Sequence, residues 1–147
     1  GIGKDFINLL ENTNMSKVYK MPVLMAFYNH GNVRMEVSEA ELLASWKEFF
    51  STGTNWKDLE KEITYEEYRK ISDKNHIQKI IKMPVHFLLK SGEEFFVKKD
   101  GAALALRDEM EEIVKEPMLV EQMKDVIEYR AMDYYRRRYK EKIKALL

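Results

Sequence analysis

The feature that most constrains the fold is a hairpin signal set inside an otherwise helical pattern. Asp100-Gly101 favours a tight turn, and it lies between the apolar stretches 94–98 and 102–106. A two-stranded hairpin is only marginally stable by itself, so it needs further strands or helices to pack against. Helical patterns dominate the rest of the chain. We therefore expect an α+β protein that is mostly helical.

Before residue 52, the sequence predicts two helical segments, a strand and the start of a third helix. A leading helix or linker is expected over residues 1–14, and a helix over residues 22–28. Alternating apolar residues predict a half-buried strand over residues 33–37. Ser38 and Glu41, three residues apart, form a capping-box pattern that marks the start of the next helix.

After residue 52, helices are expected on both sides of the hairpin. Residues 52–72 are only weakly patterned and are interpreted as an insert. A helix is expected over residues 73–90, and Pro84 within it predicts a kink or a restart, because proline has no N–H to donate. Residues 108–147 are expected to form C-terminal helices. The last of them begins at Pro117, since proline suits the first turn of a helix.

From Pro22 onward, the expected order of elements is helix, strand, helix, insert, helix, strand, turn, strand. This is the element order of a winged helix. We therefore predict a single domain over residues 1–147, with a winged-helix-like core over 16–107 and extra N- and C-terminal helices. In such a core the strand 33–37 pairs beside the hairpin, and the helix 73–90 takes the recognition position of a helix-turn-helix protein.

Composition excludes several classes of protein. The chain has 147 residues, with 25 Lys and Arg, 25 Asp and Glu, and no cysteine. The lack of cysteine excludes disulfide scaffolds, thiolate zinc sites and thiol catalysis. The longest apolar run covers eight residues, whereas a membrane helix needs about 20. We expect a cytoplasmic domain without a membrane partner, and its start at Gly1 rather than Met suggests a piece of a longer protein.

Charge is unevenly distributed along this neutral chain. Residues 69–90 contain six basic residues and one acidic residue, and residues 129–147 contain seven basic and two acidic residues. On the expected recognition helix the isoleucines are predicted to face the core, which leaves the polar positions free for DNA. Basic side chains suit phosphate oxygens, and an amide suits a base edge. The predicted contacts are Lys74, His76, Gln78, Lys79 and Lys82 on the helix, and Lys98 and Lys99 at the wing.

A second basic cluster lies near the C-terminus, where residues 134–140 interleave tyrosines with basic residues. Such a mixture can stack on bases and bind phosphates, so Arg136, Arg137 and Arg138 are further candidates for nucleic-acid contact. The alternative is structural, because the tyrosines can pack in the core and consecutive arginines point in directions about 100° apart on a helix. For both basic segments, another interpretation is a solvated helix face paired with acidic neighbours.

Motifs that support catalysis are absent from the sequence. There is no Gly-rich phosphate loop and no G-x-S-x-G nucleophile motif. His30, His76 and His86 do not have the spacing of metal ligands. We therefore expect no catalytic residue, no metal site and no cofactor in this chain.

Three segments are similar to a known group of proteins: SKVYKMPVLMAFYN (residues 16–29), PVHFLLK (84–90) and IEYRAMDYY (127–135). They resemble the C-terminal region of large bacterial DEAD/DEAH-type helicases. Some of those helicases carry an N-terminal phospholipase-D-like nuclease domain and look like restriction or defence proteins. The resemblance spans residues 16–139. It implies an ATP-dependent helicase or nuclease upstream of this chain, and it assigns no functional residue within it.

These observations predict a non-catalytic nucleic-acid-binding accessory domain of a larger DNA-processing protein. Its expected partners are duplex or single-stranded DNA and the upstream domains of the same polypeptide. One alternative is a protein-interaction or docking module without nucleic-acid binding, which an exposed apolar patch on the last helix favours. Another is a winged-helix transcription regulator, which requires a dimer to read two half-sites.

Overall fold

The computed structural model describes residues 1–147 and is mostly helical, with two small antiparallel sheets, so the predicted α+β class is confirmed. The α-helices are α1 (Ile2–Asn12), α2 (Lys20–Phe27), α3 (Glu39–Ser51), α4 (Tyr65–Arg69), α5 (Asp73–Ile80), α6 (His86–Ser91) and α7 (Pro117–Leu146). A π-helical segment, η2 (Ile81–Val85), joins α5 to α6, and the 3₁₀ turns are η1 (Asn55–Asp58), η3 (Asp108–Met110) and η4 (Ile113–Lys115). The strands are β1 (Tyr28–Asn29), β2 (Asn32–Val33), β3 (Glu36–Val37), β4 (Phe96–Val97) and β5 (Leu104–Leu106).

The larger sheet has three antiparallel strands in the order β3-β5-β4. Strands β4 and β5 form a hairpin whose turn lies at the Asp100-Gly101 pair, as predicted. The N–H of Ala102 donates to the carbonyl of Lys99 across this turn, over 3.1 Å. Gly101 lies in the left-handed region with a φ of 82°, a conformation that glycine adopts without steric cost. The two strands are shorter than the apolar stretches that predict them.

The strand expected over residues 33–37 is divided between two sheets, and only Glu36 and Val37 pair beside the hairpin as predicted. Val33 instead pairs with Tyr28 in a separate small hairpin, β1–β2, whereas β3 pairs with β5. The chain changes partner between them: the N–H of Arg34 donates to the carbonyl of Phe27, 2.8 Å away, while the carbonyl of Met35 accepts from Leu106 at 2.7 Å. Alternating apolar residues do not reveal this change, because both short strands are half-buried.

Helix boundaries follow local sequence signals closely at several points. Ser38 and Glu41 form the predicted capping box at the start of α3, and the side chain of Ser72 caps α5. Pro117 occupies the first turn of α7, as expected. Pro84 does not interrupt the helical run, which continues from α5 through η2 into α6. It lies within η2, where the wider π turn accommodates a residue without an N–H.

Two segments, the insert and the stretch before Pro117, form only short helical pieces. The insert contains η1 and the five-residue helix α4. The part of the expected C-terminal helices that precedes Pro117 forms the 3₁₀ turns η3 and η4 instead. Neither segment has an apolar stripe long enough to hold a continuous helix against the core.

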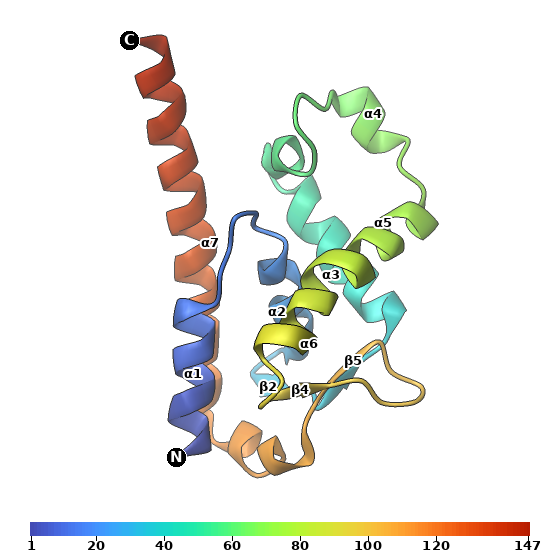
Figure 1. The fold of residues 1–147 in the computed structure, drawn as a ribbon, viewed down its shortest axis with the longest axis vertical. Coiled ribbons are helices and arrows are strands. Elements are labelled where there is room, and N and C mark those ends of the chain that lie inside the picture. Colours follow the sequence, from blue (N-terminus) through green and yellow to red (C-terminus); the bar gives the residue numbers. More distant parts are fainter.

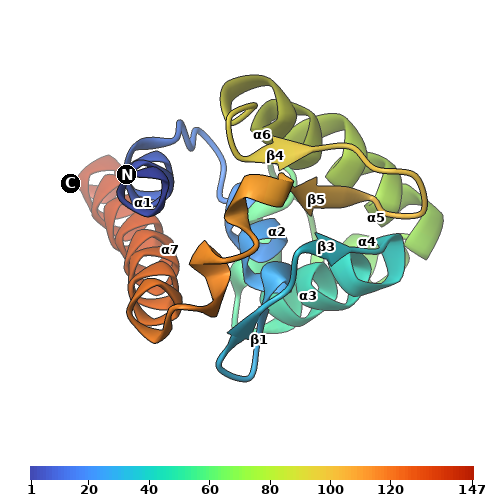
Figure 2. The same ribbon diagram turned by 90° about the horizontal axis from the view of Figure 1, so that it is seen from below.

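Figures 1 and 2 show two groups of helices around the core. α1 packs along α7 on one side, α3, α5 and α6 lie on the other, and α2 runs between them. The core is aromatic at its centre: Phe6, Phe27, Trp46 and Phe96 are at most 1% exposed. One buried cluster connects these side chains from α1 to α7, so the terminal helices pack on the same core as the sheet.

Candidate nucleic-acid interface

The continuous helical run α5–η2–α6 presents one face to the core and the other to solvent. Ile80, Val85 and Leu88 are buried, whereas Ile77 and Ile81 are only half-buried. The predicted inward face is therefore correct, although two of its three isoleucines lie at the edge. The opposite face is exposed to solvent.

The exposed face of this run is basic. Lys74, Gln78 and Lys82 are four residues apart, are all exposed, and therefore project from the same side of the helix. Lys74 and Lys82 take part in no ion pair. No acidic residue occurs between Lys74 and Lys90. The structure thus brings together three of the predicted contacts on one uncompensated surface.

The same face continues past Pro84 to residues that sequence reasoning missed. His86 and Lys90 are exposed, and Phe87 is 44% exposed next to them. Lys90 takes part in no ion pair either. The four-residue spacing that links Lys74 to Lys82 extends to His86 and Lys90. That signal was available in the sequence, but the expected kink at Pro84 concealed it.

A groove of about 260 Å³ adjoins this face between α6 and the segment that links α1 to α2. Lys17, Lys20 and Phe87 are among its lining residues, and none of the nine is acidic. Lys20 is 7% exposed, and its Nζ donates only to uncharged atoms: Thr13 Oγ1 at 2.8 Å and the carbonyl of Asn14 at 2.7 Å. Burial, together with the charge of Arg130, lowers the pKa of Lys20. The groove therefore adjoins the basic face and adds the aromatic ring of Phe87 and the side-chain amide of Asn14 to it.

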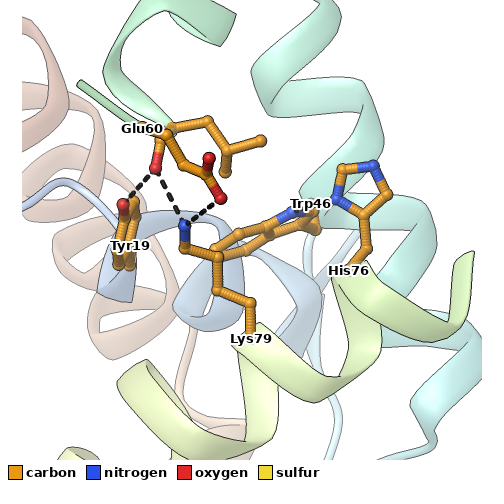
Figure 3. A network of polar contacts seen from close by, with 6 residues as sticks. Tyr19, Trp46, Glu60, His76 and Lys79 are labelled. Atoms are coloured by element: carbon orange, nitrogen blue, oxygen red, sulfur yellow. Dashed lines mark hydrogen bonds and ion pairs between the residues drawn. The ribbon is translucent and has the colours of Figure 1, made fainter. Parts of the chain in front are cut away.

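His76 lies inside the molecule, so the expectation that it faces DNA is wrong. Its ring is 3% exposed, and Nδ1 accepts a hydrogen bond from Trp46 Nε1 over 3.1 Å (Figure 3). Burial, followed by the positive charge of Lys47, lowers the pKa of His76. The residue joins α5 to α3 and is not available to a ligand.

Lys79 also has internal partners. Its Nζ donates to the carbonyl of Leu59 at 3.0 Å and pairs with Glu60 at 3.3 Å. The ammonium also lies 5.3 Å from the centre of the Tyr19 ring, and the hydroxyl of Tyr19 donates to the same Leu59 carbonyl (Figure 3). Lys79 points away from the row formed by Lys74 and Lys82, because it is one residue past Gln78. We therefore remove it from the contact set.

At the hairpin tip the two predicted lysines differ. Lys98 is exposed and takes part in no ion pair. Lys99 pairs with Asp108 at 2.6 Å, and this hydrogen bond raises the pKa of Lys99. Only Lys98 therefore offers an uncompensated charge at the tip. The hairpin loop and α5 both lie on the side of the molecule away from α7 (Figure 2).

The C-terminal arginines lie apart from this surface and are paired with carboxylates. Arg136 and Arg137 both bind Asp133, at 2.6 and 3.2 Å. Arg138 binds the buried Asp58 at 2.9 Å and so ties α7 to η1. Tyr134 is 5% exposed and packs against Tyr135 with ring centres 5.2 Å apart. These two tyrosines pack in the core, as the alternative interpretation of this segment predicts. Because the three arginines are paired with carboxylates, we leave them out of the candidate interface.

No group of three or more His, Asp or Glu side chains is arranged to hold a metal ion. None of the seven α-helices combines the length and the hydropathy that a membrane crossing requires. Compared with protein-family models, with curated proteins and with solved structures, the chain shows no match.

Proposed function

We propose that this chain is a non-catalytic nucleic-acid-binding module with a winged-helix-like core, and that it serves a larger DNA-processing protein of the helicase type. The observation that carries the proposal is the uncompensated basic face of α5–η2–α6. Phosphate contacts from Lys74, Lys82, Lys90 and Lys98 supply affinity, and Gln78 is the residue best placed to contact a base edge.

The winged-helix assignment is supported by topology. Helix α2, strand β3, helices α3 and α5 and the antiparallel hairpin β4–β5 follow one another in winged-helix order, and the small hairpin β1–β2 and the helix α4 are additions to it. Strand β3 pairs with β5, the second strand of the hairpin. The chain departs from a simple helix-turn-helix in the connection between its second and third helices. There, the insert with η1 and α4 takes the place of a short turn. Two contacts nevertheless hold α3 against α5: the hydrogen bond from Trp46 to His76 and the ion pair between Lys47 and Asp73.

A fluorescence-anisotropy titration with duplex and single-stranded DNA tests the proposal. For the wild-type chain we expect binding that weakens steeply between roughly 50 and 200 mM salt, because phosphate contacts release counterions. The K74E/K82E variant is expected to bind more weakly and to reduce the slope of log K against log salt by about 2, since each lost phosphate contact removes about 1. Preference for one DNA form identifies the natural strand state.

A matched control distinguishes the effect of this basic face on DNA binding from the effect of net charge. The K4E/K144E variant makes the same change in net charge with exposed residues of α1 and α7, neither of which takes part in an ion pair. It is expected to keep near wild-type binding. If both double variants fold and weaken DNA binding equally, or if the wild-type chain binds neither DNA, the proposed interface is wrong.

A protein-interaction role is the second candidate function, and one specific observation favours it. Helix α7 exposes large apolar side chains on the side that faces away from the core, including Met118 and Tyr129. This surface does not overlap the basic face of α5–η2–α6, so the two roles are compatible within one chain.

A further inference from the structure

Helix α7 has two apolar faces on opposite sides. Its inner face is buried against the core through Leu119, Val120, Met123, Ile127, Ala131 and Tyr134. Each residue of a helix advances about 100°, so a second set of apolar residues lies roughly opposite the first. That outer set is Met118 (77% exposed), Tyr129 (57%), Met132 (65%), Tyr139 (66%), Ile143 (40%) and Leu146 (86%). A helix that needs only one packing partner does not require this second face.

The outer apolar residues follow the heptad spacing of a coiled coil. Alternating steps of three and four residues connect the apolar residues Tyr129, Met132, Tyr139 and Ile143, and the one polar position in this stretch is Arg136. The same steps continue back through Asp125 and Gln122 to Met118, and forward to Leu146. We call these nine positions the outer seam: Met118, Gln122, Asp125, Tyr129, Met132, Arg136, Tyr139, Ile143 and Leu146. A seam of this length is typical of a helix that pairs with another helix.

The last part of α7 lacks support from its own fold. Beyond Arg138, which binds Asp58, every residue from Tyr139 to Leu147 is exposed. Figure 1 shows this end of the helix extending clear of the other elements. A short helical segment without packing is marginal in water. A partner on the outer seam would stabilise it.

Charges along α7 favour one particular partner. The first half of the helix carries Glu121, Asp125 and Glu128, whereas the second half carries most of its basic residues. Two copies in parallel would place Asp125 opposite Asp125 and Arg136 opposite Arg136. Two copies in antiparallel orientation place the acidic half of each against the basic half of the other. Unlike charges that face one another across a helix pair favour the orientation that brings them together.

We propose that α7 pairs through its outer seam with α7 of a second copy of this chain, as an antiparallel two-helix coiled coil. One register pairs eight of the nine seam positions, and only Leu146 lies beyond the overlap. Met118 packs against the partner's Ile143, Gln122 against the partner's Tyr139, Asp125 against the partner's Arg136, and Tyr129 against the partner's Met132. At the flank of this register Glu121 faces the partner's Lys142.

The geometry of each chain permits this pairing. The inner face of α7 holds the rest of the fold on the side opposite the seam, so the two bodies lie on the outside of the helix pair. Arg136 currently binds Asp133 at 2.6 Å on the surface of its own helix. It can exchange this partner for Asp125 of the second copy, because Asp133 keeps Arg137 at 3.2 Å.

Sedimentation velocity of the 147-residue chain tests the proposal independently of DNA binding. We expect a concentration-dependent mass of about twice 17.5 kDa. D125R and R136D alone are expected to raise the dissociation constant at least roughly tenfold, because each places like charges opposite one another. The D125R/R136D double variant exchanges the two charges and is expected to restore the dimer. In a parallel pair the double variant would still oppose like charges, so a failure to restore contradicts the antiparallel register.

Cysteine cross-linking gives a second readout. The chain has no cysteine, so M118C and I143C each introduce one thiol at an exposed position. Under mild oxidation, a mixture of the two variants is expected to form a mixed disulfide dimer, whereas each variant alone is not. A wild-type chain that stays monomeric up to roughly 1 mM, the range of weak association, overturns the proposal. So does a predominance of M118C–M118C dimers.

Discussion

The indole N–H of Trp46 donates to Nδ1 of His76 over 3.1 Å, and both rings are buried between α3 and α5. An accepting Nδ1 carries no proton, so this contact requires a neutral imidazole. Burial disfavours the charged form further, and the pKa of His76 is accordingly lowered. A residue that the sequence marks as a surface contact is therefore a pH-sensitive part of the core.

Stability is expected to fall in weak acid because of His76. In the unfolded chain its pKa is about 6.5, and in the folded chain it is lower, so below pH 6.5 the unfolded state binds a proton that the folded state excludes. The free energy of unfolding should therefore decline as the pH falls from about 7.5 to 5.5, by at most about 1.4 kcal/mol per pH unit, the limit for one proton. Urea denaturation at several pH values measures this slope. H76Q should remove most of it, whereas H86Q, changed at an exposed position, should not; equal slopes in wild type and H76Q would contradict the prediction.

Lys79 and Lys82 are expected to have opposite roles, although they lie three residues apart. K79M removes the contacts with the Leu59 carbonyl, Glu60 and the Tyr19 ring, and should lower the free energy of unfolding by about 1–2 kcal/mol. K82M should leave stability unchanged and weaken DNA binding, because Lys82 is exposed and takes part in no ion pair. Thermal denaturation and anisotropy titration of both variants form the comparison. The reverse pattern would show that Lys79, not Lys82, contacts DNA.

The ion pair between Asp58 and Arg138 is expected to hold α7 against η1. Asp58 is 8% exposed and lies 2.9 Å from the Arg138 guanidinium, so D58N leaves Arg138 with only the more distant carboxylate of Glu141, 4.0 Å away. We expect the free energy of unfolding to fall by about 1–3 kcal/mol, measured by urea denaturation. E112Q is the control, because Glu112 pairs with Lys115 within one exposed turn and should have little effect. A loss for D58N no larger than for E112Q would mean that α7 is held by apolar packing alone.

Local signals in the sequence were sufficient to predict where two of the helices begin and where the hairpin turns. The capping box of Ser38 and Glu41, the start of α7 at Pro117 and the turn at Gly101 each depend on residues within one turn of one another. Their chemistry does not change with tertiary context, which is why they could be predicted. The exposed row of Lys74, Gln78 and Lys82 was predictable for the same reason, since four-residue spacing alone places side chains on one helix face.

Tertiary structure decided which polar residues of the candidate site remain free. His76, Lys79 and Arg138 have the same local patterns as their exposed neighbours, but their partners lie 30, 20 and 80 residues away in the chain. The division of residues 33–37 between two sheets likewise depends on where Phe27 and Leu106 come to lie. By itself the sequence determined the class of the fold, the starts of α3 and α7, and the basic face of the run that begins with α5. Long-range packing determined which charges are neutralised, because a partner distant in sequence is brought close only when the chain folds.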